Sequence, residues 1–323
     1  MLSTRVHLRS IETISKVMCG IAFGDACGLP WEGLSARMIP QDSNAVFDLS
    51  NRMVSDDTEH ALLVLASLND SVPFEQAIRE RFRRWILGFP PSLGGATLRA
   101  GVRTLLGYSS PGVRSQGNGP LTRAAILGAS VLDPIMRAKM VNISTFLTHK
   151  DPVVYACSQM TAEIVAARIE KRDIRLHPGL GEWMASIESA LNRAPLLDVM
   201  LCLYRLPNDG ISGHAPVTLA IALQRSIVHQ SVEDAVISTV ALGGDVDSAA
   251  ALAGAFAGAS GSHPPDNWEK KLNDPLWAII APRILAGGDW PSDLQFIRKR
   301  NFQQLGWIIK LMFGMRLRAR FQR

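Results

Sequence analysis

Two short acidic segments in this sequence have the residue types of a hydrolytic metal site. The first, at 55–59, reads Ser-Asp-Asp-Thr-Glu, and the second, at 244–248, reads Gly-Asp-Val-Asp-Ser; each is followed by apolar residues. Acids are favoured at the positive end of a helix, so Asp56 as an N-cap with Glu59 in a capping box would explain the first segment alone. Two such helix starts brought together would offer up to six oxygen ligands. Oxygen donors are what Mg²⁺ prefers, so the sequence predicts a magnesium site.

The number of carboxylates indicates how many ions this site would hold. Four carboxylates at one point repel one another unless cations neutralise them. Two adjacent ions are therefore expected, as in two-metal hydrolytic sites. Mg²⁺ is the expected ion and Mn²⁺ is the alternative.

The elements that must position these residues are predicted to be helices. The chain has 323 residues, of which 47% are hydrophobic and 20% charged, which excludes a wholly disordered or fibrous protein. Alternating strand patterns are scarce, and we expect a single all-α domain over 1–323. Two segments are expected to be loops: 25–54, which has Pro30, Pro40 and few periodic apolar residues, and 107–120, which is rich in Gly, Ser and Pro. Apolar residues recur at helical spacing in the segments 11–21, 60–68, 74–87, 153–169, 198–206, 217–228 and 232–242.

The helix expected after the second acidic segment consists almost entirely of small residues. Gly254 and Gly258 lie four residues apart in it and therefore share one face. Such a face lets another helix pack closely, which would hold the metal-binding helix against its neighbours.

The basic charge of the chain is concentrated at its C-terminal end. The net charge is +5, but 298–323 holds eight of the 34 basic residues and no acid, which leaves 26 basic and 29 acidic residues elsewhere. General nucleic-acid binding is therefore not expected. We expect a terminal helix packed by its apolar side, with its arginines in solvent. Contact of this basic tail with a membrane surface or an acidic partner is the alternative.

The four cysteines and the first residues indicate the compartment. The cysteines form no CxxC pair and no zinc-like group with histidine, which favours a reducing compartment. The charged residues within 5–16 do not form the apolar stretch of a signal peptide. We expect a soluble, cytoplasmic protein.

Five segments together resemble the motifs of the ADP-ribosylglycohydrolase family, in the family's order. Residues 20–32, GIAFGDACGLPWE, resemble its opening GxAxGDAxGxPxE motif, while 55–58 and 244–248 resemble its TDDT and GDxDT motifs. Between them, 115–123 resemble an SxGNGxxxR loop and 148–152 a THxDP motif. Serine replaces threonine at 55 and 248, which keeps the hydroxyl.

This resemblance implies a compact orthogonal helical bundle with a binuclear Mg²⁺ site. It implies hydrolysis of the glycosidic bond between ADP-ribose and an acceptor, most readily an arginine side chain of a modified protein. The implied metal ligands are Ser55, Asp56, Asp57, Asp245, Asp247 and Ser248. The implied substrate-binding residues are Glu32, Ser115, Gly117, Asn118, Gly119, Arg123 and His149.

Several assignments stay open at this point. The base that takes the proton of the attacking water is Asp57 or Glu32. Arg123 contacts a phosphate or lies solvated on a helix, and His149 caps or packs rather than acting in catalysis. Two other functions remain: an immunity or binding protein that blocks a toxin ADP-ribosyltransferase, and a structural relative that binds no metal.

Overall fold

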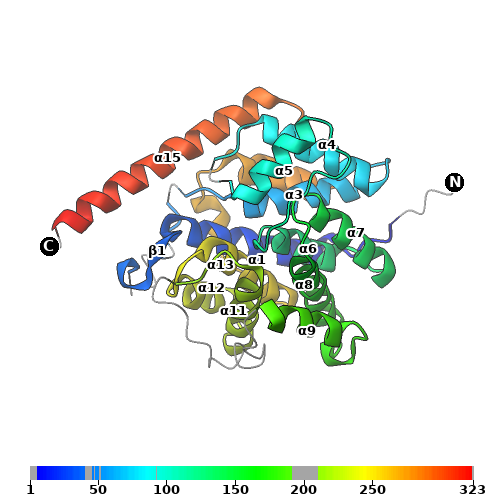
Figure 1. Cartoon of the computed structure of the whole chain (residues 1–323). Coiled ribbons are helices and arrows are strands. Elements are labelled where there is room, and N and C mark those ends of the chain that lie inside the picture. Colours follow the sequence, from blue (N-terminus) through cyan, green and yellow to red (C-terminus); the bar gives the residue numbers. More distant parts are fainter. Residues whose placement is uncertain are drawn as a thin grey trace.

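The computed structural model describes residues 6–40, 46, 48–50, 52–91, 93–190 and 210–321, with side chains up to Leu311. The described chain is a helical globule (Figure 1), and the predicted all-α class is confirmed. Among the described residues, no helix combines the length and the apolar character needed to cross a membrane. The α-helices are α1 (Ile11–Gly28), α3 (Asp56–Leu68), α4 (Phe74–Leu87), α5 (Gly95–Leu105), α6 (Pro120–Ser130), α7 (Pro134–Phe146), α8 (Pro152–Glu170), α9 (Leu180–Ala190), α11 (Ala215–Val228), α12 (Val232–Val240), α13 (Val246–Ala259), α14 (Ala281–Leu285) and α15 (Leu294–Phe321).

Short elements connect these helices. The two strands β1 (Leu34–Ser35) and β2 (Gly243–Gly244) pair antiparallel, with Leu34 opposite Gly244. Short helical turns make up the rest: η1 (Leu29–Trp31), η2 (Ala36–Met38), η3 (Ile174–Leu176), η4 (Trp268–Lys271) and η5 (Leu276–Ile280).

Most sequence-based expectations for these elements hold. Every described segment with helical spacing coincides with a helix, although α12 ends at Val240, two residues before the end of the segment 232–242; the segment 198–206 lies outside the described residues. The segment 107–119 between α5 and α6 has no helix, as expected. The loop predicted for 25–54 was wrong at its start, because α1 continues to Gly28. The last turns of α1 include Gly24 and Gly28, where its backbone meets that of α13.

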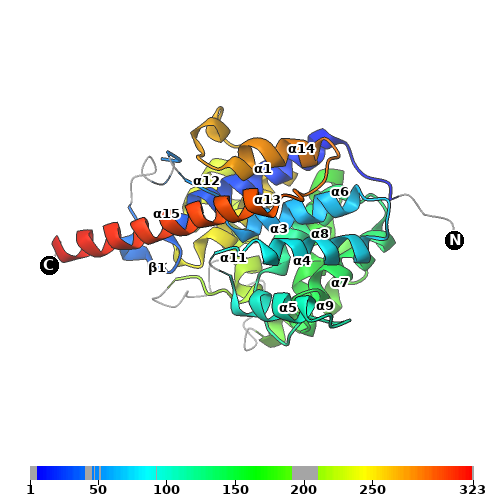
Figure 2. The same cartoon turned by 90° about the horizontal axis from the view of Figure 1, so that it is seen from above.

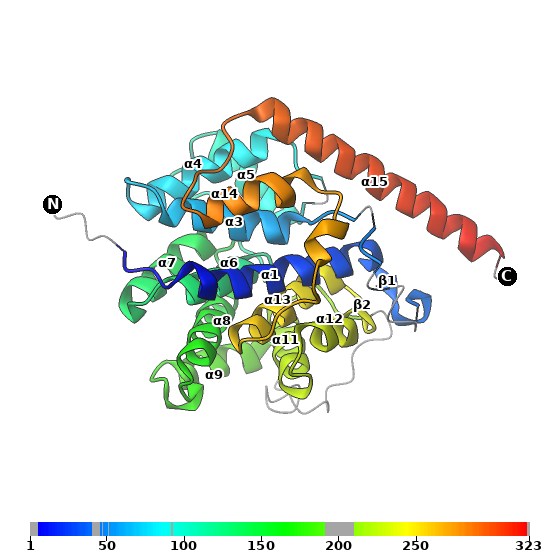
Figure 3. The same ribbon diagram turned by 180° about the vertical axis from the view of Figure 1, so that it is seen from behind.

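The centre of the fold is the pair formed by α1 and α13, which lie side by side in Figures 1 and 3. Glycines allow their backbones to touch: a Cβ atom at Gly20 would overlap the carbonyl group of Gly254, and one at Gly24 would overlap that of Ala250. A Cβ atom at Gly258 would in turn meet Lys16. The glycine face predicted on α13 therefore does pack against a helix, and that helix is α1.

The last helix, α15, crosses the molecule and extends beyond it at its C-terminal end (Figures 1 and 2). Its first turns are packed into the protein: Arg300 is 1% exposed, and Asn301 and Gln304 are also buried. The expectation that the arginines of this helix are solvated was therefore wrong for Arg300. Two buried acids, Glu59 and Asp274, pair with it and make its burial stable.

Candidate functional site

The start of α3 is held by a carboxylate of α1. Asp25 is completely buried and accepts hydrogen bonds from the amides of Ser55 (3.0 and 2.9 Å) and Thr58 (3.1 Å), and from the Thr58 hydroxyl. The N-cap of α3 is Ser55, whose Oγ accepts from the amide of Asp57 at 3.2 Å, and not Asp56 as the capping interpretation predicted. Asp25 belongs to the segment 20–32, but no function was predicted for it from the sequence. In the structure it fixes the start of α3.

The start of α13 is held by backbone on two sides. Gly243 and Gly244 have φ values of 71° and 85°, which favour glycine, and a Cβ at Gly244 would overlap Ile211. The amide of Asp245 donates to the Ile211 carbonyl at 2.8 Å. Glu32 lies two residues before β1, so the pairing of β1 with β2 brings it beside the start of α13.

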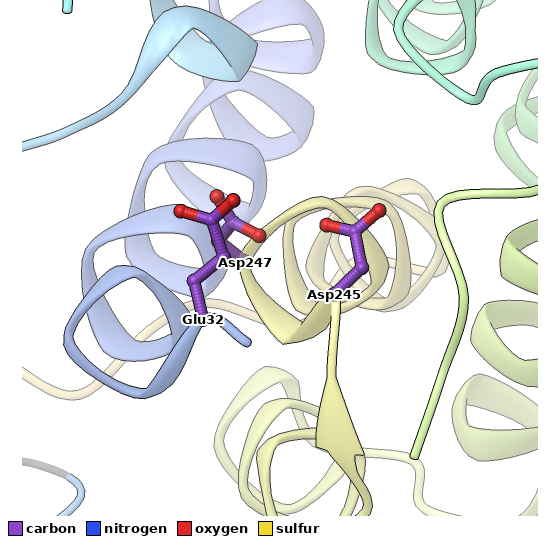
Figure 4. Close-up of side chains that lie close together, drawn as sticks. All are labelled: Glu32, Asp245 and Asp247. Atoms are coloured by element: carbon purple, nitrogen blue, oxygen red, sulfur yellow. The ribbon is translucent and has the colours of Figure 1, made fainter. Parts of the chain in front are cut away.

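Three carboxylates converge at this point. Figure 4 shows the Glu32 carboxylate beside that of Asp247, with Asp245 next to them at the first turn of α13. Ligand oxygens of the three residues lie within 4.8 Å of one another. Asp247 is buried, and its Oδ1 has no hydrogen-bond partner among the described residues.

A hydrogen bond joins the two helix starts directly. The Ser248 hydroxyl, on α13, donates to Oδ2 of Asp57 on α3 at 2.7 Å. The Thr122 hydroxyl, on α6, donates to Oδ1 of the same carboxylate at 3.1 Å. The predicted convergence of the two acidic segments is therefore present, with Asp57 at the junction of three helices.

Burial and mutual repulsion raise the pKa of the clustered carboxyls. The pKa of Asp57 is raised to about 6 by burial and then by Asp245, although the hydroxyls of Ser248 and Thr122 oppose the rise. Burial, then Asp245 and Asp57, raise the pKa of Glu32 to about 7. The pKa values of Asp56 and Asp247 are raised well above the usual range, in both cases first by burial and then by neighbouring carboxylates. Such a group of oxygens, one of them buried without a donor, fits a divalent cation, whose charge would remove the repulsion.

The Gly-rich loop before α6 lies against this cluster. Asn118 donates its side-chain amide to Oδ2 of Asp245 at 2.8 Å and to Oγ1 of Thr218 at 3.0 Å. Its backbone amide donates to the Gly213 carbonyl at 3.0 Å. Ser115 supports the loop by accepting from the amide of Gly117 at 3.3 Å. Gly117, Asn118 and Gly119, all half-buried, are thereby fixed next to the carboxylates.

His149 packs beneath this loop. It is 2% exposed, and a Cβ atom at Gly117 would lie 3.0 Å from its Nε2, so the histidine ring is in close contact with the loop backbone. Burial, and then the charges of Arg123 and Arg99, lower the pKa of His149 to about 3. The cap of the helix that follows is Asp151, which leaves packing as the role of this neutral histidine.

Arg123 lies inside the protein rather than at a surface. It is 1% exposed and donates to the Ser144 carbonyl at 3.2 Å and to the hydroxyl of Thr148. The alternative of a solvated side chain was therefore wrong, and the same burial argues against the contact with a substrate phosphate that the family resemblance implied. The charges of Asp56 and Asp57 act on Arg123, so this buried cation lies close enough to offset part of the negative charge of α3.

Comparisons with known proteins identify relatives along most of the chain. A model of the ADP-ribosylglycohydrolase family matches residues 8–292. An uncharacterized protein of Archaeoglobus fulgidus is 27% identical over 286 residues, which cover 81% of this chain and 92% of the relative. The ADP-ribosyl-(dinitrogen reductase) glycohydrolase of Rhodospirillum rubrum is 27% identical over 293 residues, with 84% and 93% covered. The solved structure of an ADP-ribosylglycohydrolase-related protein complex shares the fold, with a TM-score of 0.68 at 23% identity over 90% of this chain and 98% of that chain.

Proposed function

This chain belongs to the ADP-ribosylglycohydrolase family, a glycohydrolase family, and on that premise we propose that it is an Mg²⁺-dependent hydrolase that removes ADP-ribose from arginine side chains of modified proteins. The observation that carries the proposal is the junction of the two acidic helix starts through the bond between Ser248 and Asp57. The Rhodospirillum relative, whose name gives it an ADP-ribosylated protein as substrate, supports the choice of substrate class.

The clustered oxygens would hold the two ions. The proposed ligands are the six predicted from the sequence, together with Glu32, whose carboxylate lies among those of Asp245 and Asp247. When bound, Mg²⁺ or Mn²⁺ polarises ribose hydroxyls and lowers the pKa of a water molecule.

In this proposal Glu32 is the general base that takes a proton from the attacking water. Both oxygens of Asp57 already accept hydrogen bonds from hydroxyls, whereas the Glu32 side chain is partly open to solvent, from which a water molecule can reach it. In the proposed reaction the water oxygen bonds to the anomeric carbon of the ribose as the carbon–nitrogen bond to arginine breaks. Glu32 takes one water proton and passes it to the departing guanidine nitrogen, and the other water proton stays on the new anomeric hydroxyl.

The loop at 117–119 would orient the ADP-ribose half of the substrate. Its glycines leave backbone within reach of ribose or diphosphate oxygens, and the amide of Asn118 ties the loop to Asp245. Arg123 and His149 would not contact the substrate. The charge of Arg123 would offset part of the negative charge of α3, and His149 would support the loop by packing against Gly117.

The proposal is tested with a panel of ADP-ribosylated acceptors. Proteins modified on arginine or on serine, and ADP-ribosylated nucleic-acid ends, are incubated with the enzyme in Mg²⁺ or in EDTA, and released ADP-ribose is measured. Release from the arginine substrate in Mg²⁺ alone supports the proposal. Release from another acceptor would correct the substrate, and no metal-dependent release from any acceptor would overturn the function.

The affinity of the protein for Mg²⁺ should fall as the pH is lowered below neutral. Carboxyls must lose their protons to bind the ion, and the pKa values of Glu32 and Asp57 lie at about 7 and about 6. Their protons compete with Mg²⁺ as the pH falls through this range, so the affinity should be at least about tenfold weaker at pH 5.5 than at pH 7.5. Calorimetric titration in two buffers of different ionisation enthalpy measures both affinity and proton release. Equal affinity at the two pH values without proton release would contradict the raised pKa values.

A further inference from the structure

A buried cation of the last helix contacts the start of α3 on the side away from the carboxylate cluster. Arg300 of α15 forms an ion pair with Glu59, one turn into α3, and its Nη2 donates to the carbonyl of Val54 at 2.6 Å. Successive helical residues are rotated by about 100°, so Glu59 and Asp57 project about 200° apart from α3. The guanidinium therefore reaches α3 both before its cap and at its first turn, opposite the side that faces Ser248.

Two further residues, Gln304 and Asp274, complete this contact, and we call the group of Arg300, Glu59, Gln304 and Asp274 the Arg300 cluster. Gln304 donates its side-chain amide to the same Val54 carbonyl at 2.8 Å. Asp274 accepts from the Val54 amide at 3.0 Å and from Nε of Arg300 at 3.1 Å. The peptide groups on both sides of Val54 are thus fixed by side chains from distant parts of the chain.

The residue after Val54 is the N-cap Ser55, and the carboxylates of Asp56 and Asp57 follow it. A shift of the Val54 carbonyl would therefore move the cap and both carboxylates. Arg300 and Gln304 are 1% and 2% exposed, so they do not touch a substrate. Both residues also lie beyond 292, where the match to the family model ends.

From these contacts we propose that the Arg300 cluster positions the first turn of α3 for metal binding. Arg300 and Gln304 are positioning residues: they act through Val54 and Glu59 on Asp56 and Asp57. The inference rests on the proposed function only in that it takes Mg²⁺ as the bound ion. The contacts by which α15 orders the start of α3 do not depend on that function.

Another buried ion pair provides a matched control. Arg137 is also 1% exposed; it pairs with Glu163 at 2.7 Å and donates to the Val131 carbonyl at 2.8 Å. It thus loses the same kinds of bonds on substitution by lysine, yet none of its partners is a residue of the site.

The experiment compares Arg300→Lys and Gln304→Met with Arg137→Lys in the full chain. Lysine keeps the charge but cannot reproduce the fork of the guanidinium, and Gln304→Met removes one bond to Val54 with little change of volume. Mg²⁺ affinity is measured by calorimetry, amide hydrogen exchange at 54–60 is measured without metal, and Tm is measured for each variant.

We expect Arg300→Lys to weaken Mg²⁺ binding by about 10- to 100-fold, as is typical when a residue that orients a ligand is changed. It should also speed exchange at 54–60, with Gln304→Met following in the same direction. Arg137→Lys should lower Tm comparably but keep Mg²⁺ affinity within about twofold of wild type. If the two arginine variants change affinity and exchange equally, the positioning role is wrong. Wild type that binds no Mg²⁺ would instead overturn the proposed function, and exchange at 54–60 would still decide the role of the Arg300 cluster.

Discussion

Replacing Asp57 by asparagine is expected to lower metal-dependent hydrolysis by about 10²- to 10⁴-fold, because bound metal ions stabilise the transition state by several kcal/mol and each step of about 1.36 kcal/mol is tenfold in rate. Asparagine has the same shape: its carbonyl oxygen can accept from one of the hydroxyls of Ser248 and Thr122, and its NH₂ group can donate to the other, which rotates to accept. What it loses is the negative charge between those helices. The effect should therefore be on function and not on folding.

The same substitution should leave the metal-free protein as stable as wild type or more stable. Burial raises the pKa of Asp57 to about 6, so at pH 7.5 the carboxyl is ionised in both states, but its ionisation costs more in the folded protein and therefore lowers stability. Thermal unfolding in EDTA at pH 7.5 measures this, with Asp234→Asn as control. Asp234 also follows a serine N-cap in a first helical turn, but on α12 and exposed. A large loss of metal-free stability in Asp57→Asn, or activity equal to wild type, would contradict the assignment.

The second large effect is expected from Gly24→Ala in α1. A Cβ atom at this position would overlap the backbone of Ala250 in α13, and backbone cannot rotate away. Alanine gains about 1 kcal/mol of helix propensity over glycine, but overpacking of a tight core costs about 1–3 kcal/mol and more where the neighbour is rigid. The cost of the overlap should exceed the gain in helix propensity, so Tm should fall. Activity should fall as well, because the next residue, Asp25, holds the start of α3.

Gly181→Ala on α9 is the matched control. No atom outside its local chain lies within 4 Å of a Cβ there, so only the gain in helix propensity remains. Its Tm should stay equal or rise, and its activity should not change. A Gly24→Ala protein with the Tm and activity of wild type would show that α1 and α13 do not pack by direct backbone contact.

The sequence was sufficient to predict that two acidic helix starts meet, because both segments combine carboxylates with a hydroxyl and resemble paired family motifs. It also predicted the close-packing face of α13 from the spacing of Gly254 and Gly258, although not which helix packs there. It could not show that Glu32 joins Asp245 and Asp247, since that contact depends on the pairing of two-residue strands far apart in the chain.

Burial of charged residues was the property that the sequence could not reveal. Arg123 and Arg300 look like surface arginines on helices, and only their distant partners, such as Thr148 and Glu59, make interior positions stable. The separation of 241 residues between Arg300 and Glu59 leaves no local pattern by which their pairing could be recognised.

The central claim is that the oxygens of α3 and α13 bind divalent cations together, and calorimetric titration with Mg²⁺ tests it most directly. The wild-type protein at pH 7.5 should bind two ions, and Asp57→Ala combined with Asp245→Ala should bind none, although each variant is folded by circular dichroism. Unchanged Mg²⁺ binding in the double variant, or no binding by the wild type, would contradict the account.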